Sequence, residues 1–327
     1  MLEHVIILLI ALVVLVWSAD KFVLGASSLA RNIGVSPMII GLTIVAMGSS
    51  APEMMVAAAA SLQGNPDTAI GNAIGSNITN IALVLGLTVL IKPLVVSSST
   101  IRQELPLLLI LTLLTYWMLS DNFFSFLEGL ILMIGFFTFI SVFLIKALRQ
   151  RKDNLDDPMI TEAEQGVPEA TSTIKSIFWL IAGISLLVSS AHFLVDSAIF
   201  IAKAYGISDL VIGLTVIALG TSLPELAACI ASVIKKEDDL AMGNIVGSNV
   251  FNILAVLPFA GLIAPGEINP EASFRDVPIL IAITGLLLLL CFSRKSGCFR
   301  LTRAKGALLL ISFIAYQILL FSQTTFS

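Results

Sequence analysis

Charged residues are scarce in this chain: Asp, Glu, Lys and Arg together make up 12% of its 327 residues, whereas hydrophobic residues make up 57%. The mean hydropathy is +1.00. A water-soluble domain needs more polar surface than this, so the bilayer must be the solvent for most of the chain. Because a helix needs about 20 apolar residues to cross the hydrocarbon core, the chain has room for roughly ten crossings and little else.

Cysteine and histidine are also rare. The chain has the cysteines Cys229, Cys291 and Cys298, without a Cys-x-x-Cys spacing, and the histidines His4 and His192. This argues against a zinc site, a haem site or a disulfide framework. It also argues against an intramembrane hydrolase, because a serine nucleophile needs a neighbouring base and neither histidine lies beside a sequence motif. We therefore expect a protein that is not an enzyme and has no cofactor.

Apolar runs predict the helices. They lie near 3–30, 38–62, 68–91, 101–119, 124–147, 174–202, 209–233, 240–264, 275–293 and 303–322. The longest polar stretch, residues 149–173, separates a first set of five helices (1–148) from a second set of five (174–327). The sequence therefore predicts an all-α integral membrane protein with ten transmembrane helices.

Lysine and arginine indicate the orientation. With the N-terminus outside, the connections and helix ends on the cytoplasmic side hold Arg31, Lys92, Arg102, Lys146, Arg149, Arg151, Lys152, Lys175, Lys235, Lys236, Arg294, Lys295, Arg300, Arg303 and Lys305. The opposite side holds only Lys203 and Arg275, and Lys21 lies within the first helix. This bias predicts that both termini are outside and that the linker 149–173 is cytoplasmic.

Two segments of the chain occur twice. Residues 41–53 read GLTIVAMGSSAPE and residues 213–225 read GLTVIALGTSLPE; residues 71–81 read GNAIGSNITNI and residues 243–253 read GNIVGSNVFNI. The offset is 172 residues in both cases. Each repeat contains five crossings, and an odd number makes the second repeat enter the membrane from the other side. Two inverted five-helix repeats with interrupted helices are typical of secondary transporters with a substrate site near the midplane.

The first repeated segment carries a glutamate in the middle of an apolar helix, Glu53 in one copy and Glu225 in the other. An acidic residue at a helix centre costs roughly 3 kcal/mol on insertion scales, so it usually faces a partner or a wet cavity. A single protonated glutamate could link two helices, but two symmetry-related copies favour a functional site. Each follows a proline, Pro52 or Pro224, which interrupts the helical hydrogen bonds and allows a bend.

Neutral oxygen atoms accompany both glutamates. Hydroxyl groups precede them by three or four residues on the same helical face; these are Ser49, Ser50, Thr221 and Ser222. The second segment adds pairs at i, i+4 spacing, Ser76 with Asn80 and Ser248 with Asn252. A lone serine in a membrane helix commonly bonds its own backbone, and the pairing with asparagine makes that explanation weaker here.

The same second segment contains Gly71 and Gly75 in the first copy, and Gly243 and Gly247 in the second. Glycines four residues apart allow close approach of membrane helices. We interpret them mainly as packing positions that bring the asparagines toward the glutamates.

All these candidate ligands are oxygen atoms, which hard cations prefer, and Ca²⁺ takes six to eight of them in flexible geometry. Two carboxylates would neutralise one Ca²⁺ or share several Na⁺ with the neutral oxygens. Mg²⁺ gives up its water reluctantly and suits a fully protein-lined site less well.

The repeated motifs, G-[ST]-S-x-P-E and G-N-x-x-G-S-N-x-x-N, resemble the alpha-repeats of the sodium/calcium exchanger superfamily, and the whole chain is similar to its compact bacterial members. The resemblance implies ten helices, two inverted halves, the inner membrane as location, and alternating access in which the first and sixth helices slide past a fixed core. By motif position, the ion ligands would be Glu53, Glu225, Ser49, Ser50, Thr221, Ser222, Ser76, Ser248, Asn80 and Asn252, with backbone oxygens near Ala46 and Ala218.

Two positions depart from the pattern of many members. Ser49 stands where threonine is common, and Asn252 stands where many exchangers have aspartate. The second change removes one potential charge from the site, so it leaves the ion stoichiometry open and resembles the potassium-independent branch.

The sequence thus predicts an antiporter that exchanges Ca²⁺ for Na⁺, with these ions and the bilayer as its partners and no sign of nucleic acid or an obligate protein partner. A calcium/proton antiporter of the same fold is the nearest alternative. A channel is another class, but it would need a continuous pore in place of one occluded site.

Overall fold

The computed structural model describes residues 2–155, 172–204, 218–292 and 299–326. In the first half the helical segments are α1 (Leu2–Ile33), α2 (Pro37–Ile40), η1 (Gly41–Val45), α3 (Ala46–Ser49), α4 (Ala51–Leu62), α5 (Pro66–Ile78), η2 (Thr79–Leu85), α6 (Gly86–Ile91), η3 (Thr100–Glu104), α7 (Leu105–Leu119) and α8 (Phe126–Leu155). In the second half they are α10 (Thr173–Ala204), α12 (Ala218–Thr221), α13 (Leu223–Ile234), α14 (Asp238–Phe251), η6 (Asn252–Val256), α15 (Pro258–Ile263), η7 (Ala272–Asp276), α16 (Val277–Cys291) and α17 (Arg303–Phe326). The η segments are short stretches of π-helix that continue the neighbouring α-helices.

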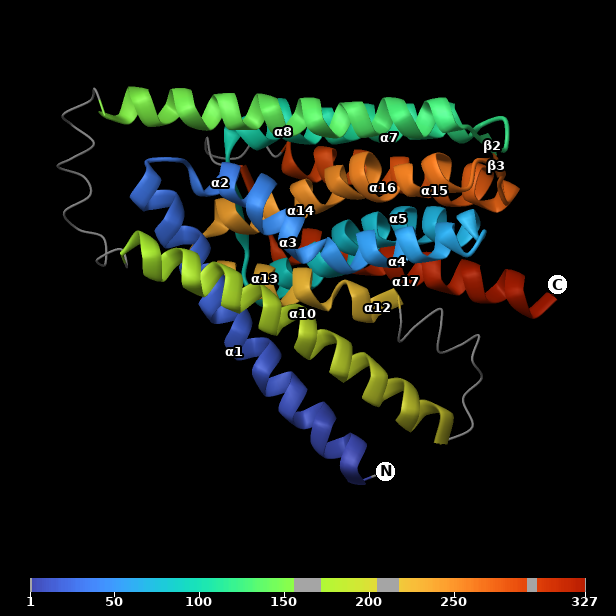
Figure 1. Cartoon of the computed structure of the whole chain (residues 1–327), viewed down its shortest axis with the longest axis horizontal. Coiled ribbons are helices and arrows are strands. Elements are labelled where there is room, and N and C mark those ends of the chain that lie inside the picture. Colours follow the sequence, from blue (N-terminus) through green and yellow to red (C-terminus); the bar gives the residue numbers. More distant parts are fainter. Residues whose placement is uncertain (1, 156–171, 205–217, 293–298, 327) are drawn as a thin grey trace.

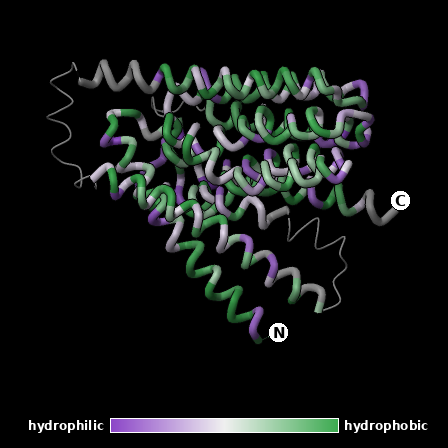
Figure 2. The backbone as a smooth tube through the Cα atoms, in the orientation of Figure 1, coloured by the Kyte–Doolittle hydropathy of each residue, from purple (hydrophilic) through white to green (hydrophobic). Residues whose placement is uncertain are grey.

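A helical segment lies at each of the ten predicted positions. By length and composition, seven helices in the described part of the chain are apolar enough to cross a membrane, and the bent pair Met38–Ser49 and Ala51–Leu62 makes an eighth. The seventh predicted helix, 209–233, is described from residue 218 onward, and its first part lies outside the described residues. The helix α8 continues to Leu155, beyond its predicted end at residue 147. Hydrophobic residues cover most of the helix lengths (Figure 2).

A serine and the proline two residues after it divide two of these crossings. The axis turns by 46° between Met38–Ser49 and Ala51–Leu62. Ser50 sits in the break with φ −83° and ψ 6°, and Ser222 has φ −91° and ψ 5° between α12 and α13. In both halves a proline occupies the start of the following helix, where its missing N–H costs no hydrogen bond. The predicted interruption of the helix is therefore present in both copies of the motif, and the bend is measured in the first.

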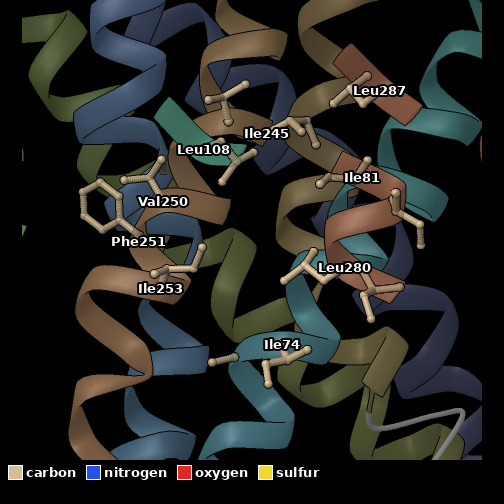
Figure 3. Packing of buried hydrophobic residues seen from close by; sticks show 14 of the residues in the cluster. Ile74, Ile81, Leu108, Ile245, Val250, Phe251, Ile253, Leu280 and Leu287 are labelled. Atoms are coloured by element: carbon tan, nitrogen blue, oxygen red, sulfur yellow. The ribbon is translucent and has the colours of Figure 1, made fainter. Parts of the chain in front are cut away.

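The core is built from both halves. Buried apolar side chains from α5, η2, α7, α14, η6 and α16 meet in one cluster, among them Ile74, Ile81, Leu108, Phe251 and Leu280 (Figure 3). The segments α14 and η6 are buried on all sides. A helix that is apolar and buried all round belongs at the centre of a bundle, so the second repeated motif lies in the middle of the protein.

Two helices stand apart from this core. The helices α1 and α10 lie side by side and run obliquely to the others (Figure 1). Their backbones approach closely at two glycines: a Cβ on Gly25 would lie 2.5 Å from the backbone nitrogen of Leu180, and one on Gly183 would lie 2.7 Å from Cα of Phe22. Such contacts leave no space for a side chain at either position.

Close packing also explains part of the second repeated motif. A Cβ on Gly243 would lie 2.7 Å from the carbonyl oxygen of Met38, and one on Gly247 would lie 2.6 Å from Cβ of Ala46. The packing role predicted for this pair is confirmed. For Gly71 and Gly75 nothing among the described residues lies within 4 Å of an added Cβ. The repeat equivalents of Met38 and Leu42, at positions 210 and 214, lie outside the described residues, so the packing prediction stays a prediction there.

Two short strand pairs, which the sequence did not predict, join the halves. The strand β1 (Leu94–Val96) pairs antiparallel with β4 (Phe299–Leu301), and β2 (Phe123–Phe124) pairs antiparallel with β3 (Gly266–Glu267). The 172-residue offset relates β1 to β3, so the two pairs occupy equivalent places in the two repeats. Each pair joins connections that the predicted topology places on the same side of the membrane.

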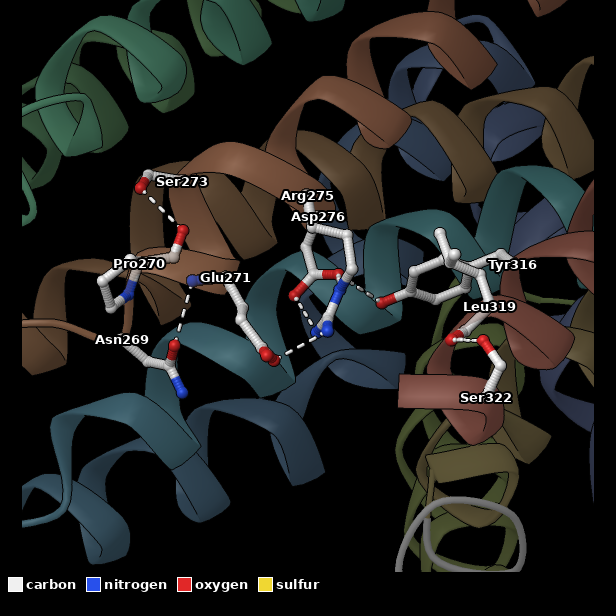
Figure 4. A network of polar contacts seen from close by, with 9 residues as sticks. All are labelled: Asn269, Pro270, Glu271, Ser273, Arg275, Asp276, Tyr316, Leu319 and Ser322. Atoms are coloured by element: carbon white, nitrogen blue, oxygen red, sulfur yellow. Dashed lines mark hydrogen bonds and ion pairs between the residues drawn. The ribbon is translucent and has the colours of Figure 1, made fainter. Parts of the chain in front are cut away.

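Ion pairs link helix ends around this core. Arg31 of α1 pairs with Glu237 at 3.0 Å, and Lys235 at the end of α13 pairs with Asp20 of α1 at 2.6 Å. Elsewhere, Arg275 pairs with Glu271 at 2.7 Å and with Asp276 at 2.8 Å. The hydroxyl of Tyr316 on α17 donates to Asp276 at 3.1 Å (Figure 4). Asp20 and Asp276 therefore link helix ends through ion pairs and a hydrogen bond.

Candidate functional site

Glu53 and Glu225 lie in the first turns of α4 and α13, and neither side chain is exposed. The breaks at Ser50 and Ser222 produce these positions, because each glutamate follows the start of a new helix. Backbone N–H groups are unpaired at a helix start, and the helix dipole there favours negative charge. The break just before Glu53 lies within hydrogen-bond distance of the Glu225 carboxylate, through Ser50. The fold thus brings two buried acids from opposite halves together.

Hydroxyl groups of the first half reach across to the second half. Ser50 donates to Oε1 of Glu225 at 3.4 Å. Ser49 donates to Oδ1 of Asn244 at 3.1 Å, and its oxygen lies 3.4 Å from the hydroxyl of Ser248. Ser49 and Ser50 are fully buried. These contacts join α3 and the break after it to α13 and α14.

The two predicted asparagines occupy equivalent places. Asn80 lies in the π-helical segment η2, and Asn252 begins the π-helical segment η6. Both side chains are fully buried. Single π-helical turns within α-helices occur frequently at functional sites, because the wider turn redirects side chains and backbone groups. The equivalent distortion in both copies follows the repeated Asn residues.

Several buried polar atoms at these positions have no hydrogen-bond partner among the described residues. They are both carboxylate oxygens of Glu53, Oε2 of Glu225, the hydroxyl of Ser222, and the side-chain oxygen and nitrogen of Asn80 and of Asn252. A buried polar group without a partner costs about 1–3 kcal/mol, and a charged group costs more. So many at equivalent positions of two repeats indicate a ligand-binding site.

The chemistry of these atoms fits a hard cation as substrate. The described residues contain no group of three or more His, Cys, Asp and Glu side chains that could hold a metal ion. A cation here would depend on two carboxylates and on neutral oxygens from hydroxyl, amide and carbonyl groups. Ca²⁺ accepts such a mixed set of oxygens.

For the remaining predicted ligands the structure gives mainly their position in the fold. Ser76 on α5 is buried, and the hydroxyl-bearing Thr221 ends α12. The carbonyl oxygen of Ala46 accepts the backbone N–H of Ser50 at 2.9 Å and retains a second lone pair. Ala218 begins α12, and the segment before it lies outside the described residues.

The sequence prediction missed other asparagines of the second motif. Asn244 contacts Ser49, and Asn77 donates to the backbone oxygen of Asn249 at 3.2 Å. Asn72 donates to the backbone oxygen of Glu53 at 3.1 Å. Their signal was present in the sequence, because all belong to the repeated G-N-x-x-G-S-N pattern. The i, i+4 spacing of serine and asparagine predicted only Asn80 and Asn252 as ligands.

Paired buried acids, two repeats and interrupted helices define a multi-pass membrane protein of the cation/calcium antiporter class, which is a class of transporters and not of enzymes. The family model described as "Sodium/calcium exchanger protein" matches residues 3–145 and 175–322. The chain belongs to the sodium/calcium exchanger family.

Individual relatives match over nearly the whole chain. The inner membrane protein YrbG of Escherichia coli is 39% identical over 325 residues, covering 98% of this chain and 98% of YrbG. The sodium/calcium exchanger MaX1 of Methanosarcina acetivorans is 31% identical over 346 residues, covering 97% of this chain and 98% of MaX1. A solved structure of the sodium-calcium exchanger NCX_Mj superimposes with a TM-score of 0.79 at 30% identity, covering 96% of this chain and 97% of that chain. That fold has ten transmembrane helices in two repeats.

Proposed function

We propose that this protein exchanges Ca²⁺ for Na⁺ across the inner membrane at a single buried site. The observation that carries the proposal is the pair of fully buried glutamates, Glu53 and Glu225, together with the buried side-chain oxygens of Ser222, Asn80 and Asn252, which have no hydrogen-bond partner among the described residues. Two negative charges match one Ca²⁺. The full ligand set is the one expected from the motifs: Glu53, Glu225, Ser49, Ser50, Thr221, Ser222, Ser76, Ser248, Asn80 and Asn252, with backbone oxygens of Ala46 and Ala218.

Sodium is the coupling ion that suits this site. A proton needs a single carboxylate, whereas a desolvated Na⁺ needs several oxygens, and both repeats supply hydroxyl and amide oxygens beside the acid. Calcium and sodium then compete for the same carboxylates, which is the basis of exchange. The names of MaX1 and NCX_Mj as sodium/calcium exchangers support this choice.

The arrangement of helices supports alternating access. In a transporter with inverted repeats, the two repeats can exchange conformations. The site then opens to one side of the membrane in one state and to the other side in the other state. The pair α1 and α10 packs tightly on itself through Gly25 and Gly183 and runs obliquely across the remaining helices (Figure 1). We infer that this pair moves as a unit while the core carrying the two glutamates stays fixed.

The orientation and the division of the chain belong to the same proposal. Both termini face outward and the linker 149–173 is cytoplasmic, between a first half of residues 1–148 and an inverted second half of residues 174–327. The excess of lysine and arginine on one side supports this orientation.

The test is calcium flux into proteoliposomes of purified protein with separately imposed sodium, potassium and proton gradients and a clamped membrane potential. We expect a sodium gradient to drive calcium uptake and a pH gradient alone to drive little. Uptake that follows the pH gradient and ignores sodium would assign the protein to the calcium/proton antiporters.

A further inference from the structure

Asn244 occupies a fixed position behind the site. Its side chain on α14 is 1% exposed, and its Oδ1 accepts the hydroxyl hydrogen of Ser49 at 3.1 Å. Its Nδ2 donates to the sulfur of Cys229 at 3.4 Å, and that thiol donates to the backbone oxygen of Ala241 at 3.7 Å. Cys229 and Ser49 are fully buried. The three side chains form a chain of hydrogen bonds from α13 through α14 to α3.

A hydroxyl group can bind a cation only through its oxygen lone pairs, and its single hydrogen must then point to another acceptor. For Ser49 the other acceptors within reach include the carbonyl oxygen of Ala46 and the hydroxyl oxygen of Ser248, both at 3.4 Å, and the carboxylate of Glu225. All of these oxygens belong to the proposed ligand set. If the Ser49 hydroxyl donated its hydrogen to one of them, that oxygen would be less available to the ion.

We propose that Asn244 is a positioning residue that takes the hydrogen of Ser49 and so leaves the oxygens of Ser49, Ala46 and Ser248 available to the ion. This inference rests on the proposed function, since it assumes that Ser49 binds the transported cation. The hydrogen bond to Cys229 fixes which end of the amide faces Ser49, because the sulfur accepts from Nδ2 and leaves Oδ1 on the side of the hydroxyl.

The thiol of Cys229 has no counterpart in the other repeat. The residue equivalent to Asn244 is Asn72, which donates to the backbone oxygen of Glu53 at 3.1 Å. Alanine, Ala57, stands in the place of Cys229. The end of the hydrogen-bonded chain at Cys229 therefore cannot be deduced from the symmetry of the motifs.

The experiment compares four proteins in the same proteoliposome assay: wild type, Asn244→Leu, Ser49→Ala and the double variant. The half-saturating calcium concentration and the maximal rate are measured separately. We expect Asn244→Leu to raise the half-saturating concentration about tenfold, corresponding to the loss of one ordered polar contact. The double variant should be no weaker than Ser49→Ala alone, because Asn244 acts through Ser49.

A second variant keeps the hypothesis testable if Asn244→Leu does not fold. Cys229→Ala removes the acceptor that orients the amide and installs the residue found at the equivalent position, Ala57. We expect it to raise the half-saturating concentration about threefold in wild type and to have no effect when Ser49 is alanine. Thr112→Val removes a buried hydroxyl that bonds only its own helix, and it should leave the calcium dependence unchanged.

The outcomes separate the two proposals. Additive losses in the double variant, or a folded Asn244→Leu protein with unchanged calcium dependence, would overturn the role of Asn244 and leave the exchange function standing. A wild-type protein without sodium-driven calcium uptake would overturn the proposed function itself.

Discussion

Ser50, in the break of the first half, donates a hydrogen bond of 3.4 Å to Oε1 of Glu225 in the second half. The equivalent hydroxyl of the second half, Ser222, has no partner among the described residues. The two copies of one motif therefore have different surroundings in a single conformation. An inverted-repeat transporter requires this asymmetry. If both copies had the same surroundings, an exchange of conformation between the repeats would not change the side to which the site opens.

The paired acids give the most direct prediction. Glu53→Gln and Glu225→Gln preserve the volume and hydrogen-bonding capacity of each side chain but remove one of two charges. We expect each variant to lose calcium transport while it still inserts and purifies as wild type, because one carboxylate cannot neutralise a divalent ion. Glu3→Gln, at the exposed start of α1, is the matched control. Near-normal calcium flux in either site variant would show that its glutamate has a purely structural role.

The strand pairs allow a test of orientation. Val95 of β1 is 46% exposed and Phe123 of β2 is 43% exposed, and the predicted topology places them on opposite faces. Single cysteines at these positions, in a background without the three native cysteines, should react with an impermeant thiol reagent from opposite sides of the membrane. Val95→Cys should react from the cytoplasmic side. Reaction of both from one side contradicts the ten-helix topology.

Close packing at Gly247 predicts a strong effect of a very small change. A Cβ at this position would lie 2.6 Å from Cβ of Ala46 and 2.8 Å from the backbone oxygen of Leu42. Gly247→Ala should therefore lower the thermal unfolding temperature of the purified protein and displace α3 from α14. Gly285→Ala on α16 is the control, because it meets nothing within 4 Å and replaces glycine by a better helix former, worth up to about 1 kcal/mol. Equal unfolding temperatures for the two variants would refute the packing argument.

The ion pairs of α1 predict an effect on conformational balance. Arg31 with Glu237 and Asp20 with Lys235 tie α1 to the turn after α13. The equivalent positions of the other repeat carry no opposite charges: Lys203 is related to Arg31 and Asn65 to Glu237, while His192 is related to Asp20 and Gln63 to Lys235. These ion pairs thus favour the conformation described here over the alternative one, in which the two repeats have exchanged conformations.

Glu237→Gln should shift the population away from this conformation by up to about fivefold, because a partly exposed ion pair contributes roughly 0.2–1 kcal/mol. Spin labels at Val13 on α1 and Ile263 on α15, both at exposed positions, would report the shift as a second distance population. The exchanged pair Arg31→Glu with Glu237→Arg should restore the original distribution. A distribution unchanged by Glu237→Gln means that this ion pair does not bias the cycle.

The sequence predicted the helices and the central acids because both depend on local pattern. Apolar length defined the crossings, and the repeated motif with Pro52 or Pro224 defined the breaks. It did not predict that Ser49 bonds Asn244, because identical motifs in two repeats cannot tell which copy lies in which conformation. The pairing of Asp20 with Lys235 was also missed, since a sequence does not specify how far α1 is displaced along its neighbours. The strands β1 and β4 have three residues each, too few to show an alternating pattern.

The strand pairs have a consequence for how the chain folds during synthesis. Leu94 pairs with Leu301, about 200 residues later in the chain. The ribosome has completed nearly the whole polypeptide before β1 can meet its partner, and contacts of such large sequence separation form slowly. The segment that contains β1 is therefore inserted into the membrane without its strand partner until β4 and the last helix have been synthesised. Quality-control proteases would encounter a truncated chain in that incomplete state.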